Sequence, residues 1–159
     1  PENAFGKGSP AIAVGGYSLG TRNGGESRAN RTAKVGTDYD IWYARAAKTL
    51  DRVGRITVGY YTGNEKLLVD ENGNPDKNGV MLTWEKTLDR ISENLSVNVD
   101  FQSGKSTYGV LSYGFVWKFA SNVAVSFGFV DQRNRRINPG NTFVVEVDID
   151  QALEKLRKP

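Results

Sequence analysis

The sequence predicts an all-β protein, an antiparallel up-and-down (meander) β-barrel with eight strands that follow one another along the chain. Eight segments alternate apolar and polar residues, which is the side-chain period of a strand whose two faces have different surroundings. Eighteen glycines and seventeen aromatic residues (three Trp, seven Tyr and seven Phe) against five prolines are typical of a sheet with many tight turns. The connections between the segments also tend to alternate between long and short.

The eight predicted strands are each bounded by turn residues. They cover residues 11–21, 39–50, 54–63, 79–88, 94–104, 108–120, 122–132 and 141–150. The segment 11–21 is the weakest, because Gly15 and Gly16 lower its strand propensity. Residues 1–150 therefore form one predicted barrel domain. Residues 151–159 form a charged C-terminal tail, either a short helical turn or a frayed end.

In the second, third and fourth segments, one set of alternating side chains is apolar and the other is polar or small. Segment 39–50 is mixed, with Trp42, Ala44 and Ala46 on one face and Arg45 on the other. Segment 54–63 sets Ile56, Val58 and Tyr60 against Arg55, Thr57 and Gly59. Segment 79–88 sets Val80, Leu82 and Trp84 against Thr83, Glu85 and Thr87. Each alternation predicts a strand with one apolar face.

The last four segments predict which face is outside. Segment 94–104 sets Leu95, Val97, Val99 and Phe101 against Ser96, Asn98, Asp100 and Gln102. Segment 108–120 sets Leu111, Tyr113, Phe115, Trp117 and Phe119 against Ser112, Gly114, Val116 and Lys118. Segment 122–132 sets Val123, Val125, Phe127 and Phe129 against Ala124, Ser126, Gly128 and Val130, and segment 141–150 sets Phe143, Val145, Val147 and Ile149 against Val144, Glu146, Asp148 and Asp150. Small residues fit the crowded interior of a narrow barrel, whereas five bulky side chains per strand would overfill it. The apolar face is therefore predicted to point outward, toward lipid.

Segment length agrees with a membrane barrel. The segments are about ten residues long, and a strand needs about nine to eleven residues to cross a bilayer at a tilt. No window of about 18 consecutive apolar residues occurs, which excludes a transmembrane helix. Longer connections at one end and shorter ones at the other are typical of an outer-membrane barrel, with periplasmic turns and extracellular loops. An even strand number then predicts that both termini are periplasmic.

The composition excludes several functions. The chain has no cysteine, so it has no disulfide or thiolate metal site, and it has no histidine, the usual general base and commonest metal ligand. The net charge of +3 is modest and well mixed, which does not favour a nucleic-acid partner. Barrel lipases, acyltransferases and proteases rely on a histidine. We therefore expect no enzymatic activity and no cofactor or metal.

The charged side chains of the inward face are the predicted lumen-lining residues. They are Arg45, Arg55, Glu85, Asp100, Lys118, Glu146 and Asp148. In a closed eight-stranded barrel such charges would pair and plug the lumen. With additional strands they would line a water-filled channel. The sequence leaves both alternatives open.

Aromatic residues of the outward face are the predicted lipid-facing and girdle residues, since rings favour the two membrane interfaces. They are Trp42, Tyr60, Trp84, Phe101, Tyr113, Phe115, Trp117, Phe119, Phe127 and Phe129. Tyr17, Tyr39 and Tyr108 are expected in the girdle near the long loops.

Two loops carry weaker signals. Asp70, Asn72, Asn74 and Asp76 have the spacing of a calcium loop, but Pro75 and Met81 stand where its glycine and bidentate glutamate belong, so a polar turn is the better interpretation. Arg133, Arg135 and Arg136 could bind phosphates of lipopolysaccharide, or form a merely solvated loop.

Three stretches carry a family resemblance: "GSPAIAVGGYSLGT", "ITVGYYTGNEKLLVDENGNPDKNGVMLTWEKTL" and "DFQSGKSTYGVLSYGFVWKFASNVAVSFGFV". They resemble an uncharacterised family of porin-like outer-membrane β-barrel proteins of Gram-negative, deltaproteobacterial-type bacteria. The likeness spans most of residues 9–150 and implies a bacterial outer-membrane location. It also implies that the chain is the C-terminal part of a longer barrel. In the usual pattern the last strand ends on an aromatic residue, whereas here Phe143 begins it.

The function predicted from these features is a non-enzymatic outer-membrane barrel, either a passive pore that serves transport or a structural barrel. One alternative is a soluble, lipocalin-like barrel that binds a hydrophobic ligand inside. Another is a surface interaction protein that acts through the loops 22–38 and 64–78. The oligomeric state is not predicted.

Overall fold

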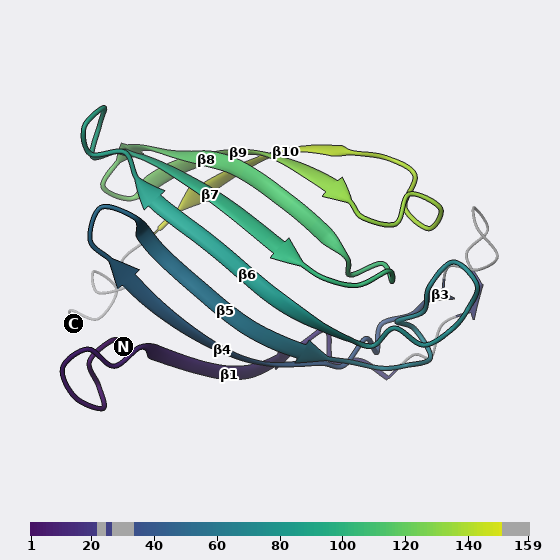
Figure 1. The fold of residues 1–159 in the computed structure, drawn as a ribbon. Coiled ribbons are helices and arrows are strands. Elements are labelled where there is room, and N and C mark those ends of the chain that lie inside the picture. Colours follow the sequence, from purple (N-terminus) through teal and green to yellow (C-terminus); the bar gives the residue numbers. More distant parts are fainter. Residues whose placement is uncertain (22–24, 27–33, 151–159) are drawn as a thin grey trace, which may run out of the picture.

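The protein is an all-β chain whose main element is one antiparallel sheet. The computed structural model describes residues 1–21, 25–26 and 34–150. Eight strands form the sheet in the order β1-β4-β5-β6-β7-β8-β9-β10, so every strand pairs with its neighbours along the chain (Figure 1). Their bounds are Ala11–Tyr17 (β1), Ile41–Leu50 (β4), Gly54–Thr62 (β5), Asn78–Thr87 (β6), Leu95–Gln102 (β7), Val110–Ala120 (β8), Val123–Gln132 (β9) and Thr142–Ile149 (β10). The predicted antiparallel meander of eight strands is confirmed.

The observed strands lie within the predicted ranges or within two residues of them, with one larger difference. The first strand ends at Tyr17 rather than at residue 21, since Ser18 adopts a positive φ of 52° that ends the extended conformation. A small ribbon of β2 (Gly25–Glu26) and β3 (Lys34–Val35) in the first long connection was not predicted, because two-residue strands are too short to show an alternation. The tail 151–159 lies outside the described residues.

The sheet curls but does not close into a barrel. Closure requires ladder hydrogen bonds between the first and last strands, and β1 pairs only with β4 while β10 pairs only with β9. Figure 1 shows the two edges apart, at opposite sides of the curled sheet. The prediction of a closed barrel is therefore not met by the described residues. Alternation is a property of each strand by itself, so it contains no information on whether the edge strands meet.

The connections separate to the two ends of the sheet, as predicted. Turns 51–53, 88–94 and 121–122 lie at one end, which we call the short-turn end (Figure 1). The connections 63–77, 103–109 and 133–141, with residues 18–21 and 36–40 of the first connection, lie at the other, which we call the long-loop end. The length alternation is not strict, because turn 88–94 is as long as loop 103–109. Residues 88–94 form a compact turn in which Ile91 and Ser92 both donate backbone hydrogen bonds to the Leu88 carbonyl, at 2.7 and 2.8 Å.

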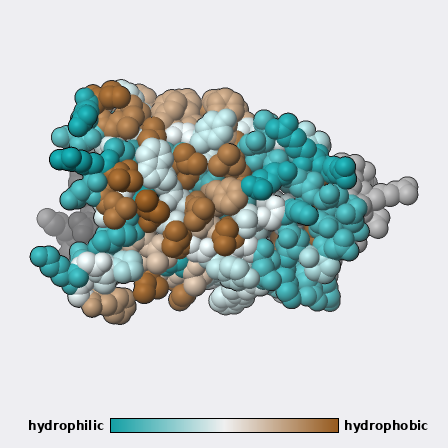
Figure 2. Space-filling model, in the orientation of Figure 1, coloured by the Kyte–Doolittle hydropathy of each residue, from teal (hydrophilic) through white to brown (hydrophobic). Residues whose placement is uncertain are grey.

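The strand register separates the two sets of side chains onto opposite faces. On the outward face Phe115 lies opposite Phe127 and Tyr113 opposite Phe129, and these ring centroids are 5.1 and 6.0 Å apart. On the inward face Gly114 lies opposite Gly128. Figure 2 shows apolar side chains over the strands and hydrophilic ones over the long-loop end. The large side chains of β8 and β9 are thus on the outward face.

The buried core is small and lies inside the curled sheet at the long-loop end. Its centre is Ile41, Tyr61 and Leu68, each with no exposed surface. Partly buried side chains pack against these three: Tyr17, Tyr39, Tyr43, Met81 and Tyr108. The expectation that Tyr17, Tyr39 and Tyr108 belong to an outer girdle is therefore wrong. Tyr17 shares the inward face with Tyr43, and the other two lie in loops, where strand alternation does not report direction.

Candidate functional site

Four of the seven predicted lumen-lining residues meet around one hollow on the inward face. Arg45 (β4), Arg55 (β5), Glu85 (β6) and Asp100 (β7) line a space of about 360 Å³. The register explains the grouping, because Arg55 lies directly opposite Glu85. The hollow continues toward the short-turn end into a larger one of about 590 Å³, which Arg55 and Glu85 also line.

Side-chain contacts are formed by two of the four charged groups of this hollow, Asp100 and Arg45. The Thr83 hydroxyl donates to Asp100 Oδ1 at 2.7 Å, and the Asn98 amide donates to Asp100 Oδ2 at 3.2 Å. The Arg45 guanidinium lies over the Tyr43 ring, 4.4 Å from its centroid, a cation–π contact. Both oxygens of Asp100 are thus hydrogen-bonded, whereas within the described residues no ion pair joins these four charged groups.

The other three predicted lumen-lining residues do not join this hollow. Lys118 and Asp148 both lie opposite Ala124, one on each side of β9, and Glu146 lies opposite Ser126. All three are on the inward face and exposed: Glu146 and Asp148 are on the edge strand β10, and Lys118 is near the short-turn end of β8. The sequence placed them on the correct face but could not show how far the sheet curls over them.

A tyrosine cluster lies inside the curled sheet at the long-loop end. Tyr108, in the loop between β7 and β8, contacts Tyr17 at the end of β1 with 6.2 Å between ring centroids. It also lies 6.0 Å from Tyr61 and 5.7 Å from Tyr39. Because β1 and the β7–β8 loop belong to opposite walls of the curled sheet, these rings meet across the interior. Sequence reasoning missed this cluster, because nothing local distinguishes an inward tyrosine from a girdle tyrosine.

The long loops are tied to one another by carboxylates. Asp76 in loop 63–77 accepts backbone hydrogen bonds from Lys105 and Ser106 in loop 103–109, at 2.5 and 2.7 Å. Asp70 accepts from the backbone amides of Asn72 and Asn74, at 2.9 and 2.8 Å. These acids thus accept backbone hydrogen bonds, which supports the polar-turn interpretation over a calcium loop.

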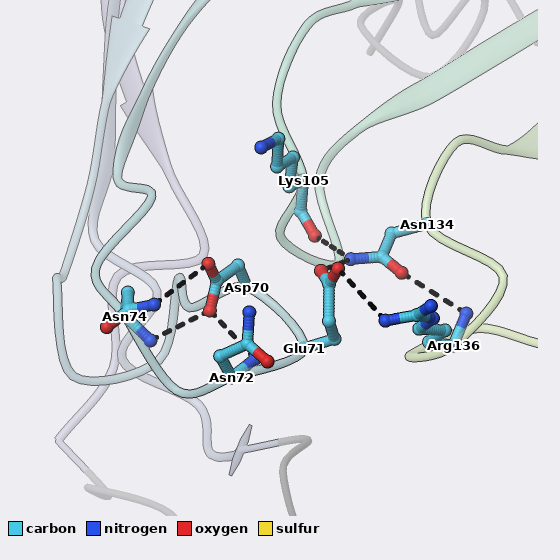
Figure 3. Close-up of polar contacts among 7 residues, drawn as sticks. All are labelled: Asp70, Glu71, Asn72, Asn74, Lys105, Asn134 and Arg136. Carbon is cyan, nitrogen blue, oxygen red and sulfur yellow. Dashed lines mark hydrogen bonds and ion pairs between the residues drawn. The ribbon is translucent and has the colours of Figure 1, made fainter.

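Figure 3 shows how the loop 133–141 joins this assembly. The Asn134 amide donates to Glu71 Oε2 and to the Lys105 carbonyl, both at 2.6 Å. Asn134 Oδ1 accepts from the Arg136 backbone at 3.2 Å, and Arg136 Nη1 lies 3.7 Å from Glu71 Oε1. Three loops that are distant in sequence therefore meet at Glu71 and Asn134.

The three arginines of this loop have different neighbours. Arg136 pairs with Glu71, Arg135 pairs with Asp131 at 3.1 Å, and the Arg133 guanidinium lies 4.9 Å from the centroid of Phe101. The Arg135 and Arg136 side chains are 67% and 80% exposed, so these contacts leave most of each guanidinium in solvent. These contacts thus hold the loop in place, and its cationic groups are still exposed to solvent.

We expect acid to release the tie between Glu71 and Asn134. Hydrogen bonds from the Glu71 backbone and the Asn134 amide lower the pKa of the Glu71 carboxyl. Because this pKa is lowered, the ionised Glu71 carboxylate stabilises the folded state fully at pH values above the ordinary glutamate pKa of about 4.3. This stabilisation is lost as pH falls through the folded-state pKa. An NMR titration of the Asn134 side-chain amide should show a midpoint below that value, and Glu71→Gln should abolish the transition. A midpoint at or above the ordinary value would contradict the assignment.

The predicted girdle residues all lie on the outward face. Exposed fractions are 57% for Trp42, 65% for Phe119 and 49% for Phe129. Trp84 is partly covered because its indole N–H donates to the Val53 carbonyl at 2.9 Å, and Phe101 is partly covered by Arg133. Phe119 lies at a β-bulge and keeps its ring beside Trp117, with centroids 6.3 Å apart.

Comparison with protein-family models, with curated proteins and with solved structures finds no match to this chain. In the described part of the chain we find no helical segment with the length and hydropathy that a membrane crossing needs. Within the same residues, no three acidic side chains gather closely enough to hold a metal ion.

Proposed function

We propose that this chain forms a non-enzymatic membrane β-barrel of the outer-membrane type, and that it is a structural barrel closed at its long-loop end rather than an open pore. The observation that carries the proposal is the distribution of side chains between the two faces. Exposed apolar residues run along the outward face from Ile12 in β1 to Ile149 in β10. Outside the core at the long-loop end, the inward face carries mainly charged, hydroxyl and small residues. Soluble monomers rarely expose so extended an apolar surface, whereas a membrane barrel requires one.

The tyrosine cluster supports the closed form over the pore. An eight-stranded barrel has an interior just wide enough for side chains to fill. The contacts of Tyr108 with Tyr17 and Tyr61 place three rings together inside the sheet at one end, as a closed interior requires. The hollow around Arg45 and Asp100 continues toward the short-turn end, where Arg55 and Glu85 line both spaces.

The distribution of side chains between the two faces argues against a soluble barrel that carries a hydrophobic ligand. Such a barrel would need its apolar side chains inside, where this chain has Arg45, Arg55 and Asp100. A surface interaction through the loops is compatible with the membrane proposal. Parts of the loop 22–38 lie outside the described residues, and the loop 63–77 is fixed to its neighbours by Glu71 and Asp76.

Tryptophan fluorescence tests the proposal directly, because all three tryptophans lie on the outward face. Trp42 is near the long-loop end, and Trp84 and Trp117 are nearer the short-turn end. We expect the chain to float with vesicles and all three indoles to be quenched by lipids brominated in the acyl chain. The matched control is Tyr43→Trp in a background with the three tryptophans changed to Phe, since an inward indole should be shielded. A folded chain that stays in solution without quenching would refute a membrane barrel.

A measurement of conductance separates the two membrane alternatives. A reconstituted chain whose interior is closed by tyrosines should give no stable single-channel current. Steady conductance from the native chain would show that it forms a pore and would contradict the structural barrel.

A further inference from the structure

A basic hollow lies among the long loops, just beyond the apolar outward face. It has a volume of about 470 Å³ and is lined by four cationic side chains and one carboxylate. The cations are Lys105, Arg133, Arg135 and Arg136, and the carboxylate is Glu71. The loops that form it are held together by Asn134, as described above.

The surplus charge of the hollow belongs to two of its cations. Arg136 is opposed by Glu71, and Arg135 by Asp131. Among the residues that the structure describes, no carboxylate lies within salt-bridge distance of Lys105 or Arg133. Asp70 forms no ion pair with Lys105, although the charge of Lys105 contributes to lowering the pKa of the Asp70 carboxyl. The lining of the hollow therefore carries more positive than negative charge, and its guanidinium groups at Arg135 and Arg136 remain largely exposed.

The position of Arg133 relates the hollow to the apolar face. Phe101 is on the outward face at the end of β7 that leads into the long loops, and Arg133 lies over its ring. Arg133 follows directly after β9, and its backbone amide donates to the Gly109 carbonyl at 3.0 Å. If the outward face is in lipid, as the proposed function holds, Arg133 is at the level of the lipid headgroups.

We propose that this hollow binds the phosphate of a lipid headgroup, preferentially a phosphomonoester. Guanidinium groups donate two parallel hydrogen bonds to phosphate, and a lysine adds a compact charge. A phosphomonoester carries up to two negative charges, which Lys105 and Arg133 would oppose, since neither forms an ion pair within the described residues. A free phosphate has the same chemistry, but only a lipid-linked phosphate is held at the edge of the apolar face. The inference therefore rests on the membrane proposal and deepens it.

The test uses the full chain in neutral detergent with short-chain phosphatidic acid, short-chain phosphatidylcholine and inorganic phosphate as separate probes. We expect phosphatidic acid to bind at least tenfold more tightly than either of the others. The double variant Lys105→Gln/Arg133→Gln should lose about tenfold in affinity for each charge removed, because a charge-assisted hydrogen bond contributes about one decade or more. These substitutions leave the ties among Glu71, Asn134 and Arg136 unchanged.

Arg90→Gln is the matched control, since Arg90 is an exposed cation in the turn 88–94 at the opposite end of the sheet. It should bind phosphatidic acid as the native chain does. Equal binding of inorganic phosphate would assign the hollow to free anions and overturn the lipid proposal. Equal losses in the double variant and in Arg90→Gln would show general electrostatic attraction and also overturn it. A chain that incorporates into phosphatidylcholine vesicles but shows no preference for phosphatidic acid would refute this site and leave the membrane barrel standing.

Discussion

Tyr61→Ala should lower the free energy of unfolding by about 3–5 kcal/mol, the range found when a large buried aromatic side chain is removed. Tyr61 has no exposed surface, and its hydroxyl donates to the Ser103 carbonyl at 2.7 Å. Its ring covers Gly79 on the neighbouring strand so closely that a Cβ built at Gly79 would lie 2.4 Å from it. Truncation leaves a cavity in the tyrosine cluster and frees the loop 103–109 from β5.

Urea titration of the folded chain would measure the loss. Tyr60→Ala is the matched control, because Tyr60 is the same residue type one position earlier, on the outward face and 53% exposed. Tyr60→Ala should lower the free energy of unfolding clearly less than Tyr61→Ala does. Tyr61→Phe should cost about 1 kcal/mol, the net contribution of one hydrogen bond. Equal losses for Tyr60→Ala and Tyr61→Ala would show that packing inside the curled sheet is not the source of the stability.

Phe115→Arg should destabilise the folded chain in a bilayer by about 2–4 kcal/mol, the cost of an arginine at the lipid midplane of a barrel. Phe115 is near the middle of β8, is 42% exposed, and stacks on Phe127. In water the same substitution would replace an exposed apolar ring by a charge at little cost. The size of the effect therefore reports which solvent the outward face contacts.

The experiment compares the folded fractions of the native chain, Phe115→Arg, Phe115→Leu and Asn72→Arg during urea titration in lipid vesicles. Phe115→Leu keeps the apolar surface, and Asn72→Arg adds the same charge to an exposed loop. Both should stay close to the native chain. A Phe115→Arg variant as stable as Asn72→Arg would be incompatible with lipid at this position.

Local alternation made most of the strands predictable, since it depends only on neighbours in sequence. The register of β8 and β9, with Phe115 opposite Phe127, follows because both strands alternate in phase across a short turn. The closure of the sheet could not be predicted in the same way. It depends on whether β1 and β10 meet, and these strands are far apart in sequence.

For the same reason, the candidate site was predictable where its residues lie in strands and not where they lie in loops. The direction of Arg45, Arg55, Glu85 and Asp100 follows from strand period, and the structure brings these four together. Tyr108 and Lys105 lie in a loop, where no period fixes direction, and their places depend on contacts between distant segments. The arginine loop was recognisable as a motif, but its connection to Glu71 was not.

The two free edges of the sheet determine whether an even or an odd number of strands can be inserted between them. Because the eight strands alternate in direction, β1 and β10 run antiparallel to each other. They can therefore pair directly, or through an inserted segment that contributes an even number of strands, if every pair is to stay antiparallel. A second copy satisfies the rule as well, since two chains joined edge to edge would give a ring of twice as many strands. In hydrocarbon an unpaired backbone edge is strongly unfavourable, so both edges are expected to be paired in a membrane. The number of strands in the resulting ring then sets the width of its lumen.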